Sequence, residues 1–170
     1  MTKQSVAGEV QSALLWLKDH SSKATLEGMA RYAIPSDHAY GVAMKDIKAL
    51  GKQLGENQEL ACALWNTGVY EARMLASFVG DPARITSEQM DRWCSEFDNW
   101  AFCDAMCFNL FDRTPHAWGK VSRWTASKQE FVKRTGFALL WRFWKSPLAP
   151  GPDWYVFPTL YLLFVAGLQT

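Results

Sequence analysis

The stretch that decides the fold reads FDNWAFCDAMCFNLF and occupies residues 97–111. Asp98 or Asn99 can cap a helix that starts near Trp100, because a short polar side chain accepts from the free N–H groups of a first helical turn. Trp100 and Asp104 are four residues apart, which places an indole and a carboxylate on one helical face. The remaining side chains are mostly apolar and lie all round the helix, so we expect it to be buried on several sides.

A carboxylate on such a helix needs an explanation, since an unpaired buried charge is costly. Two interpretations of Asp104 stay open from spacing alone. The carboxylate supports the fold through a hydrogen bond or an ion pair, or it marks a site where negative charge takes part in chemistry.

Length and composition favour a globular protein, either one compact domain or a short helical array. The chain has 170 residues, of which 49% are hydrophobic and 21% charged, and this balance excludes a disordered protein. The first twenty residues lack the apolar core of a secretory signal, so we expect a cytoplasmic protein whose four Cys are reduced and buried. Cys103 and Cys107 are four apart, but no His or second Cys pair completes a zinc set, and no metal is expected.

The charges are divided unevenly along the chain. Residues 1–112 carry 10 Lys and Arg against 15 Asp and Glu, a net of −5. Residues 113–170 carry 8 against 2, a net of +6, and all eight cations fall within 113–145. Such a split indicates either an anionic partner for one face, most commonly nucleic acid, or a solvated basic surface without a partner.

Apolar residues recur at helical spacing along most of the chain, and no segment alternates with a period of two. The sequence therefore predicts an all-α protein, with short helices in antiparallel pairs that stack as an array. Ser127 is expected to cap the last long helix, with Glu130 at its third position. The predicted helices cover residues 2–19, 23–33, 42–54, 59–65, 69–79, 86–97, 100–111, 115–124 and 128–145.

Two further expectations concern packing near the C-terminal end. Residues 146–170 are rich in Pro and apolar side chains, and we expect them to form a divergent segment that packs on the helical domain of residues 1–145. The apolar run there is split by Pro158 and is too short to cross a bilayer. Most of the aromatic residues Trp118, Trp124, Trp141 and Trp144 are expected in the core between helices.

Five short motifs occur in an order that resembles the AlkD-type DNA alkylation repair proteins. They are MARY at 29–32, YGV at 40–42, ALWNTGVYEARMLA at 63–76, NWAFCD at 99–104 and WTASKQEFVKRTGFALL at 124–140. Each motif is weak alone, and the resemblance covers about residues 26–145. It implies a curved α-solenoid of HEAT-like, or armadillo-like, antiparallel helix pairs whose concave basic surface holds duplex DNA.

The resemblance also implies a function and residue roles. The family removes cationic N3- and N7-alkylated purines in base excision repair, with no cofactor. Trp100 would then lie against the deoxyribose, Asp104 would stabilise the oxocarbenium-like sugar and position water, and Arg134 would bind the DNA backbone. The partner would be double-stranded DNA with alkylated bases, bound in the nucleoid, while protein partners stay open. The remaining expected phosphate contacts are Arg113, Lys120, Arg123, Lys128 and Lys133.

Two other functions stay possible at this point. Family members usually continue into a segment with a second functional Trp and a nearby Arg, and nothing in residues 146–170 matches it. That departure favours a non-catalytic helical-repeat module that binds nucleic acid. A protein-interaction scaffold is the third candidate, because helical arrays often serve that use and a fold does not determine a function.

Overall fold

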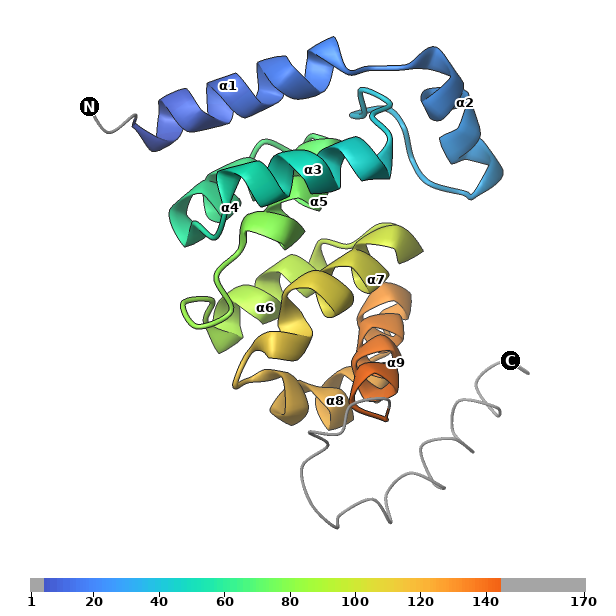
Figure 1. Cartoon of the computed structure of the whole chain (residues 1–170). Helices are drawn as coiled ribbons and strands as arrows, with labels where there is room; N and C mark the ends of the chain where they lie inside the picture. The colour runs from blue at the N-terminus through green and yellow to red at the C-terminus, as the bar shows by residue number, and fades with distance from the viewer. Residues whose placement is uncertain (1–4, 145–170) are drawn as a thin grey trace.

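The computed structural model describes residues 5–144, and the expected C-terminal segment at 146–170 lies outside this range. The described part is all helical, as predicted (Figure 1). None of its helices is long and apolar enough to cross a membrane. The elements are α1 Val6–Asp19, α2 Lys23–Arg31, α3 Met44–Leu54, α4 Gln58–Trp65, α5 Tyr70–Val79, α6 Ser87–Ser95, α7 Trp100–Asn109, the 3-10 turn η1 Phe111–Arg113, α8 Ala117–Thr125 and α9 Glu130–Trp144.

The helices stack as the predicted solenoid. Helix α3 packs against α5, α5 against α7, and α7 against α9, so these four form one row. Helices α1 and α4 contact each other, α4 also packs on α5, and α6 and α8 pack on α9. Figure 1 shows the stack running from α1 at one end to α8 and α9 at the other. We call α3, α5, α7 and α9 the site row, since α7 carries Trp100 and Asp104.

Side-chain caps fix where several helices begin. Asn99 is the cap of α7, and its Oδ1 accepts from the N–H groups of Ala101 and Phe102. Thr86 caps α6 by accepting from the N–H of Gln89. For α7 this decides between Asp98 and Asn99, which the sequence left open.

The predicted start of α9 is wrong. Ser127 Oγ accepts from the N–H of Gln129 in a turn before the helix, and the Gln129 carbonyl takes the first helical hydrogen bond, from Lys133. Glu130 is therefore the first helical residue and not the third, so it cannot reach back as a capping box requires. A hydroxyl that serves a local turn imitates a helix cap in the sequence.

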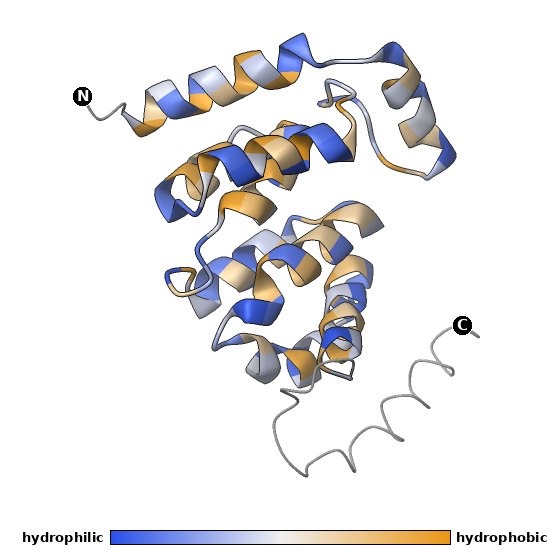
Figure 2. Ribbon diagram, in the orientation of Figure 1, coloured by the Kyte–Doolittle hydropathy of each residue, from blue (hydrophilic) through white to orange (hydrophobic). Residues whose placement is uncertain are grey.

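One continuous core runs through the stack. In α7 the buried side chains are Phe102, Cys103, Met106 and Cys107, as expected for a helix covered on several sides. Hydrophobic and polar segments alternate along the ribbon of each helix, as Figure 2 shows.

The expectation that most of the four late Trp residues lie in the core is wrong. Trp124 is buried, whereas the exposed fractions of Trp118, Trp141 and Trp144 are 39%, 54% and 59%. Helix α9 turns a different face, with Gly136 and Leu139, toward its neighbours. The two Trp residues of α9 consequently lie on its outer side.

Candidate functional site

Trp100 and Asp104 stand one turn apart at the start of α7. The cap at Asn99 begins the helix at Trp100. Trp100 lies off the buried side of the helix and is 38% exposed. The side chain of Asp104 retains 28% of its exposure. The indole and the carboxylate are thus both accessible from solvent, on an element anchored by its core side.

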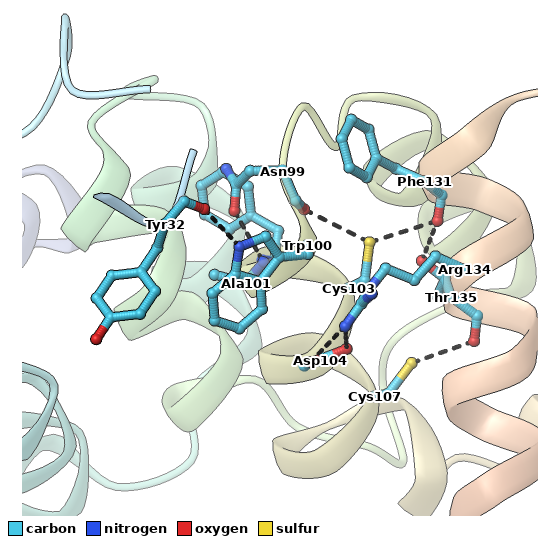
Figure 3. A network of polar contacts seen from close by, with 11 residues as sticks. Tyr32, Asn99, Trp100, Ala101, Cys103, Asp104, Cys107, Phe131, Arg134 and Thr135 are labelled. Atoms are coloured by element: carbon cyan, nitrogen blue, oxygen red, sulfur yellow. Dashed lines mark hydrogen bonds and ion pairs between the residues drawn. The ribbon is translucent and has the colours of Figure 1, made fainter. Parts of the chain in front are cut away.

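A contact distant in sequence fixes the orientation of the indole. Trp100 Nε1 donates to the backbone carbonyl of Tyr32 at 2.8 Å (Figure 3). Tyr32 directly follows α2 as its C-cap, and it is 65% exposed. The hydrogen bond joins α7 to the segment between α2 and α3, so Trp100 presents one ring orientation.

That segment is itself held by a buried carboxylate. Glu71 is fully buried in α5, and its two oxygens accept from the backbone N–H groups of Tyr40, Gly41 and Val42 at 2.7–3.3 Å. Gly41 has φ +79°, and a Cβ there would lie 2.5 Å from the Ser22 carbonyl oxygen. The turn therefore needs glycine at residue 41. The sequence did not reveal the role of Glu71, because its partners are backbone N–H groups about 30 residues away.

Asp104 does not stand alone on its face. Arg134 Nη2 donates to both carboxylate oxygens, at 3.0 and 3.2 Å, across the α7–α9 contact. The same guanidinium carbon lies 5.8 Å from the centre of the Trp100 ring. Figure 3 shows the Arg134 side chain reaching from α9 to Asp104 on α7, with Trp100 on the same helix as Asp104. These three residues form the candidate site, and the ion pair explains how Asp104 is accommodated.

Two thiols beneath the site join α7 to α9. Cys103 Sγ donates to the carbonyl oxygens of Asn99 and Phe131, and Cys107 Sγ donates to that of Thr135. Burial raises the pKa of the Cys103 thiol to about 11 and that of Cys107 well above its usual value. Protonated, covered thiols are poor nucleophiles and poor metal ligands. No cluster of metal-ligating side chains occurs among the described residues.

Most cations expected at a DNA surface are paired with carboxylates of the acidic half. Arg113 Nη1 lies 2.9 Å from Glu56, and Arg142 pairs with Asp112. Lys120 and Arg123 share Asp91, at 2.8 and 3.0 Å. Five of the seven cations at 113–142 are thus paired, counting Arg134 with Asp104. The charge split of the sequence is largely balanced inside the molecule.

Lys120 differs most from its expected role. Its side chain is 7% exposed, so it faces Asp91 and not an open surface. Burial alone would raise the pKa of Asp91, but hydrogen bonds from Lys120 and Trp124, with the nearby Arg123 charge, outweigh it and lower that pKa. This cluster attaches α8 to α6 and serves the fold.

Lys128 and Lys133 are the two cations of this region that are exposed and form no ion pair within the described part of the chain. Lys133 is next to Arg134 on α9, beside the candidate site. Lys128 lies in the turn before α9. Both fit the expectation of a solvent-facing cation.

A second group of cations was missed by the sequence analysis. Lys45, Lys48 and Lys52 are exposed on α3, and none forms an ion pair within residues 5–144. Their spacing of three and four residues places them on one helical face, opposite the buried Ile47 and Leu50. The spacing was visible in the sequence, but the acidic balance of residues 1–112 concealed it. Because α3 belongs to the site row, the structure places these lysines on the same row of helices as Trp100 and Asp104.

A cavity of about 270 Å³ opens beside the start of α7. Its walls include Tyr70, Asp98 and Phe102, but neither Trp100 nor Asp104. Burial, together with the charges of Glu71 and Asp98, raises the pKa of the Tyr70 hydroxyl. The candidate site is therefore an open surface, and this cavity lies next to it.

Comparisons with known proteins agree with this architecture. The model of the family described as DNA alkylation repair enzyme matches residues 13–154. No curated protein sequence matches significantly. A solved structure described as "a new family of proteins related to the HEAT-like repeat DNA glycosylases with affinity for branched DNA structures" superposes with a TM-score of 0.80 at 20% identity.

The superposition covers 91% of this chain and 66% of that chain, so the chain spans slightly less than two thirds of its length. At this identity the likeness shows a shared fold, and the predicted HEAT-like solenoid is confirmed. Residues 13–154 also include the five motifs from which the resemblance was drawn.

Proposed function

The chain belongs to the DNA alkylation repair enzyme family, and we propose that it is a DNA glycosylase that excises cationic N3- or N7-alkylated purines from duplex DNA. One observation carries the proposal. An aromatic face, a carboxylate and a guanidinium converge on an open surface of α7 and α9. These are the groups needed to approach a sugar, to stabilise positive charge on it, and to hold a phosphate.

The reaction does not require the protein to protonate the leaving base. An alkylated purine is already a cation, so the bond between C1′ and the base nitrogen breaks with its electron pair leaving on a neutral base. Positive charge then develops on the deoxyribose. Asp104 stabilises that charge, and the carboxylate accepts a proton from the water that adds to C1′. The fixed Trp100 ring offers an electron-rich face to the same cation.

An open surface suits this reaction if the base is not drawn into an enclosed pocket. Carboxylates fulfil the same role in glycoside hydrolysis, where the sugar passes through a similar cationic state. Binding would come from phosphate contacts by Arg134, Lys133 and Lys128, supplemented by the lysines of α3. Arg113 and Arg123 would have to leave their carboxylates to contribute, and buried Lys120 no longer belongs to the proposed surface.

The test is release of free methylated purine from alkylated duplex DNA. We expect release by the parent chain and a loss of at least about a hundredfold with Asp104→Asn, which keeps the shape and removes the charge. Glu130→Gln is the matched control, because it removes an exposed carboxylate on α9 and should leave the rate unchanged. Equal release by parent and Asp104→Asn would disprove the role of Asp104.

A second function is favoured by a specific feature of the site. Arg134 neutralises Asp104 in the free protein, as suits a module that binds DNA without cleaving a glycosidic bond. The structural relative with affinity for branched DNA suggests the ligand. No release from alkylated DNA, together with tighter binding to a four-way junction than to duplex, would establish this alternative.

A further inference from the structure

The ion pair between Asp104 and Arg134 conflicts with the proposed chemistry. A carboxylate that stabilises a cationic sugar must face it, but Arg134 Nη2 lies 3.0 and 3.2 Å from its two oxygens. The guanidinium also stands 5.8 Å from the Trp100 ring. The guanidinium therefore neutralises the carboxylate that would have to face the positive charge of the sugar.

We propose that Arg134 exchanges Asp104 for a DNA phosphate when the protein binds, so that Asp104 is released only in the complex. The proposal rests on the DNA binding contained in the proposed function and adds a regulation of the same site. In the free protein, Arg134 keeps the carboxylate neutralised. In the complex, its guanidinium binds the backbone and leaves the face of Trp100 and Asp104 to the nucleotide.

The exposure of the ion pair to water allows this exchange. The Arg134 side chain is 47% exposed and that of Asp104 is 28% exposed, so water screens their attraction. An exposed pair of this kind changes an equilibrium constant by up to about fivefold. A phosphate offers the same guanidinium two charge-assisted hydrogen bonds, and DNA binding also releases counterions.

The pair formed by Lys120 and Asp91 shows what a structural ion pair looks like in this protein. The Lys120 side chain is 7% exposed, and Asp91 also accepts from Arg123 and from Trp124 Nε1. Removing Asp91 would leave the covered ammonium group of Lys120 without a counter-charge. Asp104 has no donor other than Arg134 among the described residues, so one rotation of the arginine frees it.

The neighbourhood of Arg134 supports its move toward a phosphate. Lys133 precedes it on α9, is exposed, and forms no ion pair within the described residues. The buried residues of α9 are Thr135, Gly136, Leu139 and Leu140, whereas the Arg134 side chain is 47% exposed. Arg134 can therefore turn without disturbing the helix.

The experiment measures affinity for undamaged duplex DNA over a range of salt concentrations. In the plot of log K against log salt, each phosphate contact contributes a slope of about −0.9. We expect Arg134→Gln to make the slope shallower by about 0.9. Asp104→Asn should leave the slope unchanged and tighten binding by roughly two- to fivefold at each salt concentration, since no ion pair has to be broken.

The opposite pattern would overturn the exchange. If Arg134 stays on Asp104 in the complex, Arg134→Gln leaves the slope unchanged, while Asp104→Asn frees the arginine and makes the slope steeper by about 0.9. The matched control is Arg84→Gln, which breaks an exposed pair with Glu59 away from the site and should not alter the slope.

The use of undamaged DNA separates this inference from the proposed excision. Failure to release methylated purines, with the expected slopes intact, would reject the glycosylase and keep the exchange. Release of purines with an unchanged slope for Arg134→Gln would keep the glycosylase and reject the exchange. The absence of any salt-dependent DNA affinity would reject both.

Discussion

Single residues outside the candidate site help to set the orientation of its side chains. Glu71 holds the backbone at residues 40–42, and the same segment includes the Tyr32 carbonyl that accepts from Trp100. A buried carboxylate in α5 thereby helps to orient an indole on α7. Charge-assisted hydrogen bonds to backbone N–H groups are strong enough to make such a segment part of the rigid frame.

Asp91 provides a prediction of pH dependence. Its pKa is lowered in the folded protein, so it contributes stability that is present above the unfolded pKa and lost as the pH falls through the folded value. At pH 7 we expect Asp91→Asn to reduce the free energy of unfolding by about 3 kcal/mol, because covered Lys120 loses its counter-charge.

Urea unfolding at a series of pH values checks this prediction. The difference in the free energy of unfolding between the parent and Asp91→Asn should shrink below about pH 4, where the Asp91 carboxyl of the parent becomes protonated. A difference that stays constant down to pH 2.5 would show that the charge of Asp91 is not the cause.

At the scale of elements, the site depends on how closely α9 approaches its neighbours. Gly136 faces α8, and a Cβ there would lie 2.5 Å from the Thr125 backbone nitrogen and 2.8 Å from the Trp124 carbonyl carbon. No side-chain rotation can relieve a contact with backbone atoms. The two helices pack at this distance because residue 136 has no side chain.

Two glycine substitutions test that contact against helix propensity. Gly136→Ala should lower the free energy of unfolding by about 1–3 kcal/mol, because the helices must separate. Gly119→Ala on α8 is the matched control, since nothing lies within 4 Å of its Cβ, and it should raise stability by up to about 1 kcal/mol. Thermal unfolding of both variants measures the two effects, and equal shifts in Tm would contradict the prediction that only residue 136 is in close contact with α8.

At the scale of the whole molecule, the distribution of charge is the main feature. The acidic half and the basic half attract each other along the stack, through pairs such as Glu56 with Arg113 and Asp112 with Arg142. The exposed cations left without an ion pair in the described part include Lys133 on α9 and the lysines of α3. Both helices belong to the site row, so a polyanion along this row would meet cations on either side of α7.

Neutralising two lysines tests this surface. Lys48→Gln with Lys52→Gln should weaken binding to undamaged duplex DNA and make its salt slope shallower by up to about 1.8, or 0.9 for each phosphate contact. The matched control replaces Lys18 on α1 and Arg92 on α6, two exposed cations outside the site row, with Gln. Equal effects of the two double variants would place the DNA elsewhere or reject a localised surface.

The sequence by itself determined the class of fold and the local elements. Apolar side chains at helical spacing, with turn residues between them, define helices before any long-range contact forms, and most of them begin within a few residues of the predicted position. The four-residue spacing of Trp100 and Asp104 likewise followed from helical geometry alone. Ser127 was misleading because a hydroxyl can serve a turn as readily as a helix cap.

Only the tertiary structure decided which charges are available. Asp104 and Arg134 are 30 residues apart, and their ion pair exists because α7 and α9 pack together. The same is true of Lys120 with Asp91, and of Glu71 with the turn at residues 40–42. A charge count along the chain cannot anticipate these pairs, because Coulomb attraction depends on the distance between side chains in space and on their exposure to water.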